Sequence, residues 1–239
     1  MLVLQWPQIF FLCWYALLLY RTAAVHNRQI KVSFPTVLIR FVLLCLLLGW
    51  GGFFSSTAQA QTIPAQAQRY RLELVRAAHS QWGLDAPIAA LAAQVHQESV
   101  WNPQAVSRVG ARGLAQFMPA TAQWWCQLHR IAPEQCQPHN PTWALRALVG
   151  YDKYLFDRTP LRFGGFDRQW VMLRSYNGGL GHWQAEAKST GFARPTRVQV
   201  DDACGQARRH RSHCSENLGY PVQILQVLQP RYQSWGALL

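Results

Sequence analysis

One acidic side chain, Glu98, lies in the stretch of the chain whose residue types best suit chemistry. Glu98 closes an apolar, alanine-rich run, and the turn-forming pair Asn102–Pro103 follows it. An acid in apolar surroundings keeps its proton to a higher pH, because burial disfavours the charged form. A protonated carboxyl group near neutral pH can donate its proton to the oxygen of a glycosidic bond. The sequence therefore predicts a general acid for the cleavage of a sugar polymer.

A helix over 87–98 is expected to position this acid. Asp85 is the predicted cap of that helix, and Pro87 is tolerated in its first turn. The helix is apolar on most sides, which predicts a central, buried element. A loop over 105–113 with two glycines should then bring polar groups towards Glu98.

The remaining pattern is also helical. Amphipathic spacing predicts further helices at 66–82, 114–125, 142–156, 168–176 and 222–232. The segment 189–215 is polar and basic, and we expect a long loop or flap there. No period-2 alternation is long enough for a sheet, so the predicted fold class is mostly α.

Four short motifs follow one another along the chain. They are E-S-x-W-N-P-x-A at 98–105, G-A-x-G-L-x-Q-x-M-P-x-T-A at 110–122, S-Y-N-G-G at 175–179, and Glu216 with Tyr220. Over roughly 70–228 the chain resembles the lytic transglycosylase domain of the soluble lytic transglycosylase (SLT) type. The resemblance implies a lysozyme-like helical domain that cuts bacterial peptidoglycan.

The resemblance also implies a mechanism that needs one carboxyl group. Glu98 would protonate the β-1,4 oxygen between N-acetylmuramic acid and N-acetylglucosamine, and its carboxylate would then take the proton of the muramic acid 6-hydroxyl. The product is a 1,6-anhydro end, with no water consumed. Ordinary glycosidases use two carboxyl groups, whereas Asp85, Glu134 and Asp152 are interpreted as cap or surface residues.

Six further residues are carried over from the family as substrate-binding candidates. They are Ser99, Gln116, Met118, Tyr176, Asn177 and Tyr220. Ser99 and Tyr220 could also hydrogen-bond Glu98 itself. Structural roles stay open beside these, above all core packing for the methionine and tyrosine and a helix cap for the asparagine. No cofactor or metal is expected. Three positions depart from the family pattern: Ala115, Leu218 and Pro221.

The N-terminal part predicts export. Segments 2–20 and 37–54 are strongly apolar, a basic stretch separates them, and Ala58–Gln59–Ala60 matches a signal-peptidase site. A signal peptide ending at Ala60 and a membrane hairpin with a cytoplasmic basic loop both fit. Either places residues 61–239 in the periplasm or outside, and the hairpin would anchor them to the inner membrane. The predicted division is therefore an export region, 1–60, and a transglycosylase domain, 61–239.

The cysteines beyond residue 60 agree with export. There are four, which an oxidising compartment favours as disulfides. We expect the local pairs Cys126–Cys136 and Cys204–Cys214. A zinc site is the alternative, because His129, His139, His210 and His213 lie near in sequence.

The net charge of +12 suits a polyanionic partner such as the bacterial wall. We expect a monomer that binds peptidoglycan strands and no nucleic acid. By analogy, the domain could open the wall locally for a conjugation or secretion machine. Two other functions stay open. One is a goose-type hydrolytic lysozyme, and the other is a non-catalytic wall-binding module of an export machine.

Overall fold

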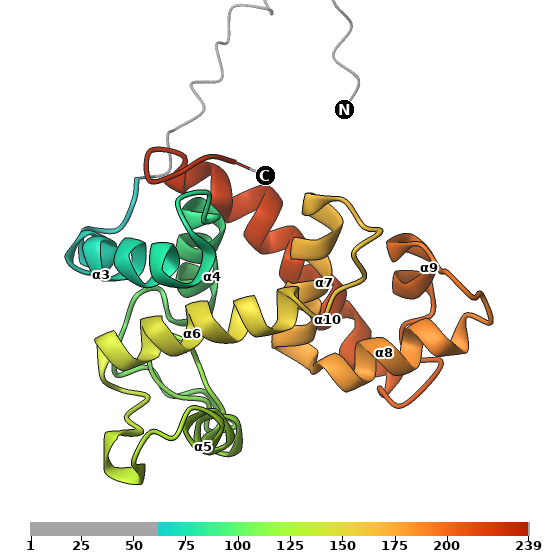
Figure 1. Cartoon of the computed structure of the whole chain (residues 1–239), viewed down its shortest axis with the longest axis horizontal. Coiled ribbons are helices and arrows are strands. Elements are labelled where there is room, and N and C mark those ends of the chain that lie inside the picture. The colour runs from blue at the N-terminus through green and yellow to red at the C-terminus, as the bar shows by residue number, and fades with distance from the viewer. Residues whose placement is uncertain (1–61, 239) are drawn as a thin grey trace, which may run out of the picture. The chain divides into compact units, whose positions relative to one another are not determined.

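The computed structural model describes residues 62–238, which form helices joined by short loops (Figure 1). The helices are α3 (Ala65–Trp82), α4 (Ile88–Ser99), α5 (Pro119–Leu128), η2 (Pro133–Gln135), α6 (Pro141–Phe156), α7 (Gly165–Gly178), α8 (Leu180–Ser189), α9 (Arg197–Asp202), η3 (Arg211–His213), α10 (Cys214–Val222), η4 (Gln223–Leu228) and η5 (Gln229–Tyr232). Within this part of the chain there are isolated β-bridges but no strands. The mostly α prediction is confirmed.

The expectations for residues 1–60 lie outside the described residues. Within 62–238, none of the helices combines the length and the apolar character that a bilayer crossing requires.

Helix α4 is buried along most of its length. Every residue from Ile88 to Val95 is buried, and the helix packs against α3, η4 and η5 (Figure 1). The all-round apolar pattern therefore predicted its place correctly. Asp85 is not its cap, however: Pro87 holds the cap position, and no side chain there accepts a hydrogen bond.

The end of α4 comes before the turn-forming pair Asn102–Pro103. The helix ends at Ser99 because Val100 adopts a left-handed conformation, with φ of 50°, and Trp101 follows with φ of 64°. The Val100 amide closes the last turn on the carbonyl of His96 at 2.9 Å. A β-branched residue in this region is strained.

The side chain of Trp101 anchors the turn after α4. It is fully buried, and its Nε1 donates to the hydroxyl of Tyr232 at 2.7 Å. Its ring also contacts the rings of Tyr70 and Trp235. Trp101 therefore anchors the loop in the core, and this packing offsets the strain at Val100.

The loop before α5 replaces the helix that we expected from residue 114. Arg112 and Phe117 exchange backbone hydrogen bonds of 3.0 and 3.2 Å, and Gln116 has φ of 47°. Gly113 has φ of 75°, and a Cβ there would overlap the carbonyl of Pro138. These close contacts hold the segment as a tight turn, so α5 begins only at Pro119, which suits a first turn because it lacks an N–H.

The segment 189–215 is more ordered than the flap that we expected. Helix α9 begins with a capping box between Thr196 and Gln199. The C-terminal helix also differs: it begins at Cys214, and its π-helical part starts at Gln223, just after Pro221. A proline inside a helix removes a backbone donor, which accounts for a change of winding there.

Both predicted disulfides are present. Cys126 pairs with Cys136 and Cys204 pairs with Cys214, and the two cysteines of each pair are ten positions apart in sequence. The zinc alternative is contradicted, since all four thiols are used.

Candidate active site

Glu98 lies in the last turn of α4 and meets the hydroxyl of Tyr220, which donates a hydrogen bond to its Oε1. Tyr220 comes from α10 and is buried, whereas Glu98 keeps partial contact with solvent. The two possible roles of Tyr220 thus occur together, because one buried tyrosine packs in the core and contacts the acid. The carboxyl group is therefore held by Tyr220 in a residue that keeps some exposed surface.

The pKa of Glu98 is raised to about 7, and burial is the largest cause. The Tyr220 hydrogen bond stabilises the charged form and acts against this shift, while the nearby carboxylate of Glu216 adds to it. Desolvation outweighs the hydrogen bond, so Glu98 is protonated in a large part of the molecules at neutral pH. That protonation state is what a general acid requires.

Tyr176 lies between Tyr220, which contacts Glu98, and the loop over 105–117. Its ring stacks parallel to that of Tyr220 with 6.5 Å between centroids, and its hydroxyl donates to the carbonyl of Ala115 at 2.6 Å. Burial raises the pKa of Tyr176 well above its ordinary value, and the Glu98 charge acts in the same direction. Tyr176 therefore stays neutral, and its side chain links α7 to the loop over 105–117.

Ser99 and Gln116 direct their donors to the backbone. The Ser99 hydroxyl lies 3.0 Å from the carbonyl of Leu114, and the Gln116 side-chain amide lies 3.3 and 3.1 Å from the carbonyls of Ala105 and Gly113. Ser99 thus joins α4 to the loop over 105–117, whereas Gln116 links residues within that loop. The predicted bond from Ser99 to Glu98 is absent from these contacts.

Met118 and Asn177 stand at different places around the acid. Met118 caps α5 and is 41% exposed, so it is available to a ligand rather than packed in the core. Asn177 lies in α7, donates to Glu216 at 3.2 Å and accepts from Asn217 at 3.0 Å. The asparagine thus links α7 and α10 near the acid, beyond the capping role that the sequence also allowed.

A buried polar pair behind the acid was missed by the sequence analysis. Asp152 is fully buried, where we expected a cap or surface residue, and it accepts from the amide of Gln94 at 3.2 Å. Burial raises the pKa of Asp152 well above its usual range, and the Glu98 charge adds to the effect. Gln94 lies one turn before Glu98 on a buried helix, and a polar residue at such a position was the available signal.

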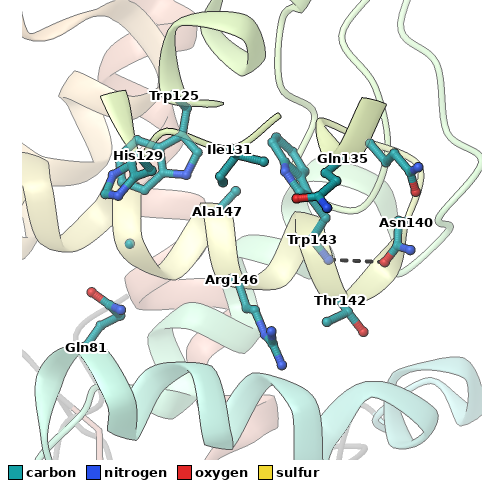
Figure 2. A pocket seen from close by; sticks show the side chains of 12 residues that line it. Gln81, Trp125, His129, Ile131, Gln135, Asn140, Thr142, Trp143, Arg146 and Ala147 are labelled. Carbon is teal, nitrogen blue, oxygen red and sulfur yellow. Dashed lines mark hydrogen bonds between the residues drawn. The ribbon is translucent and has the colours of Figure 1, made fainter. Parts of the chain in front are cut away.

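A pocket of about 640 Å³ lies between α5, α6 and the end of α3, and Figure 2 shows its lining. Trp125 and Trp143 contribute aromatic rings, and Gln81, Asn140 and Arg146 contribute polar groups. It contains none of the candidate residues. In the described part of the chain, His, Cys, Asp and Glu side chains form no group of three that could hold a metal ion.

Comparison with known proteins decides the family. A model of the transglycosylase SLT domain matches residues 73–198, more than half of the chain. The chain belongs to the transglycosylase SLT domain family. The resemblance drawn from the motifs is therefore confirmed.

Relatives of this SLT domain chain include the membrane-bound lytic murein transglycosylase F of Alteromonas mediterranea, 41% identical over 92 residues, which are 38% of this chain and 18% of that protein. The namesake from Hahella chejuensis is 30% identical over 150 residues, covering 59% of this chain and 28% of its own length. The chain spans less than a third of each relative. The 70 kDa soluble lytic transglycosylase of Escherichia coli superposes with a TM-score of 0.47 at 20% identity, over 74% of this chain and 31% of that one.

Proposed function

We propose that this chain is a lytic transglycosylase that cuts the β-1,4 bond between N-acetylmuramic acid and N-acetylglucosamine in peptidoglycan. The observation that carries the proposal is the single acid of the site, Glu98, whose pKa of about 7 keeps it protonated near neutral pH. Membership of the SLT domain family supports the choice of substrate. The relatives named lytic murein transglycosylases support the choice of reaction.

The proposed reaction has two steps, both at Glu98. In the first, the carboxyl proton passes to the bridging oxygen while the bond from that oxygen to C1 of the muramic acid breaks. In the second, the 6-hydroxyl oxygen of the same sugar bonds to C1 and its proton returns to Glu98. Tyr220 holds Oε1 throughout, because its hydroxyl has the carboxyl oxygen as its acceptor. The enzyme ends in its starting state, with no cofactor.

A hydrolytic lysozyme is the second candidate, and one observation bears on it. A hydrolase needs a second carboxylate to activate water. Asp152 is fully buried and held by Gln94, so it cannot contact a water molecule in the cleft. Glu216 is exposed and near the acid, but its Oε1 accepts from Asn177. With Asp152 excluded as the base, the product ends decide the role of Glu216: activated water leaves reducing ends, and attack by the 6-hydroxyl group leaves 1,6-anhydro ends.

The experiment is digestion of purified wall sacculi followed by mass spectrometry of the products. We expect muropeptides with 1,6-anhydro ends, and no cleavage by a folded Glu98→Gln protein, because an amide cannot donate and retake a proton. Glu134→Gln is the matched control, since Glu134 is exposed in η2. Reducing ends would favour the hydrolase, and full activity of the Glu98→Gln protein would exclude Glu98 as the acid.

The proposal includes export to the periplasm. Two disulfides favour an oxidising compartment, and the relatives carry the description membrane-bound. An inner-membrane tether through 1–60, a monomeric state and local wall opening for a conjugation or secretion machine complete it. Fractionation of cells that make the full chain tests the tether: we expect the protein in the membrane pellet, and release into the periplasmic fluid would point to a cleaved signal peptide.

A further inference from the structure

A second pocket, of about 400 Å³, adjoins the candidate active site. Asn177 and Glu216 form one wall of it, and both lie beside the acid: they hydrogen-bond to each other, and the Glu216 carboxylate contributes to the raised pKa of Glu98. Arg208 and Arg209 also line it, together with three histidines. We call this space the basic pocket. The family motifs do not include its cationic wall.

Arg209 is built into the pocket rather than lying on its surface. It is 6% exposed, its Nε donates to Glu186 at 2.7 Å, and its Nη1 lies 3.4 Å from the carbonyl of Gly178. Its Nη2 is buried without a hydrogen-bond acceptor, as is the Nδ1 of His182, another lining residue. Buried donors are rarely left without partners. An anionic group in the pocket would supply the missing acceptor.

The loop that carries these arginines is fixed in place. The Cys204–Cys214 disulfide closes it, and Glu186 holds Arg209 from α8. Gly178 is needed for this approach, because a Cβ there would lie 2.1 Å from Nη1 of Arg209. The cationic wall is therefore preorganised next to the sugar-cutting site.

The charges around the pocket favour one class of ligand. Arg209 shares the Glu186 carboxylate with Arg174, whose second partner is Asp201. Arg208 has no ion pair among the described residues, and Glu216 is the one acidic side chain that lines the pocket. The unpaired arginine and the free Nη2 donor suit a carboxylate, which a guanidinium binds through two donors.

We propose that the basic pocket binds a carboxylate of the peptide stem attached to the muramic acid that is being cut. The inference rests on the proposed function, which places a peptidoglycan strand beside Glu98. In a strand that carries stems, the lactyl carboxyl group of the muramic acid is amide-linked to the peptide, so the carboxylates of the stem are the anions nearest to the cleaved bond. The pocket would make the enzyme prefer strands that still carry peptides.

The inference is tested by measuring ligand binding to a variant that cannot cleave the glycan, so that no turnover is needed. In the Glu98→Gln background, titration calorimetry compares two forms of the disaccharide N-acetylglucosaminyl-N-acetylmuramic acid. One carries a tetrapeptide stem, and the other has its lactyl carboxyl group capped as a methylamide, so that only the stem supplies carboxylates. We expect tighter binding of the peptide-bearing form, by roughly tenfold for one charge-assisted hydrogen-bonded pair. Arg208→Gln and Arg209→Lys should each remove most of that ratio. Lysine keeps a charge near Glu186 but lacks the planar fork that points one donor at Glu186 and another at the ligand.

Arg211→Gln is the matched control, because Arg211 is exposed in the same loop but does not line the pocket. Circular dichroism of each variant checks the fold. Equal binding of the two ligands by the starting protein would overturn the inference, as would an unchanged ratio in folded Arg208→Gln protein. Failure of the proposed function has a different signature: wild-type protein would then leave sacculi intact, whatever the ligand ratio.

Discussion

The hydroxyl of Tyr220 donates its hydrogen bond to Oε1 of Glu98 across 122 residues of sequence. This contact joins the last turn of α4 to α10, so the acid is held by two helices rather than one. The bond stabilises the charged form of Glu98 and thereby limits a pKa that burial alone would raise further. Tyr220 thus both positions the carboxyl group and tunes its acidity.

The rate–pH profile should report Glu98 on its alkaline side, since activity needs its protonated form. We expect that limb near pH 7, following the raised pKa. Tyr220→Phe removes the bond that lowers the pKa of Glu98 and should move the limb to higher pH, with a lower maximal rate. Glu216→Gln removes a charge that raises it and should move the limb to lower pH.

These two opposite shifts are measured as kcat/KM on soluble glycan strands from pH 4 to 9. A limb near the unperturbed value of about 4.3 in the wild type would show that Glu98 is not a buried acid. Shifts of the same sign in both variants would contradict the assignment of Tyr220 and Glu216.

The contribution of Glu98 to the free energy of unfolding should fall as the pH rises. Its pKa in the folded protein is about 7 and exceeds the unfolded value, so the folded state holds the proton more tightly. The resulting stability is present at low pH and is lost between about pH 4.5 and 7. Glu98→Gln should therefore match the wild type at pH 4 and exceed its unfolding free energy at pH 8, by at most about 3 kcal/mol. Urea unfolding at both pH values tests this, and equal stabilities at pH 8 would refute it.

Asp152 is expected to be neutral in the folded protein at pH 7, because burial raises its pKa well above the usual range. Its Oδ2 and the Oε1 of Gln94 are both buried without partners. A protonated Asp152 can donate a hydrogen bond from its Oδ2 to the Oε1 of Gln94. Asp152→Asn preserves both bonds, so we expect a folded protein whose stability falls less than that of the wild type between pH 4 and 8. Asp152→Leu leaves Gln94 unsatisfied and should cost about 1–3 kcal/mol. Thermal unfolding distinguishes the two, and an Asn variant as unstable as the Leu variant would require an ionised Asp152.

Val100 offers a local gain in stability. It is 60% exposed with φ of 50°, and a left-handed conformation costs an ordinary residue roughly 1–2 kcal/mol. Val100→Gly should therefore raise the unfolding free energy by about 1 kcal/mol after the entropy of glycine is counted. Val109→Gly is the control, because Val109 is also exposed but is not among the residues with positive φ. A loss of stability in Val100→Gly equal to that of the control would show that no strain is stored there.

Much of the fold followed from local patterns in the sequence. The apolar helix before Glu98, the amphipathic helices on either side and the two short disulfides depend on residues within a few turns of one another. Such features leave a periodic or paired signal in the chain itself. The first two motifs likewise singled out Glu98 as the candidate acid, since their residues lie close to it in sequence.

Contacts between distant segments required the tertiary structure. Helical spacing places Asp152 on the apolar face of α6, between Leu148 and Leu155, but its bond to Gln94 of α4 forms only in the folded chain. The turn at Gly113 likewise depends on its approach to Pro138, which overrode the helical pattern from residue 114. The sequence by itself therefore determined that one acid, Glu98, ends an apolar helix within the family motif. Tertiary packing decided its pKa, since burial and the hydrogen bond from Tyr220 of α10 exist only in the folded chain.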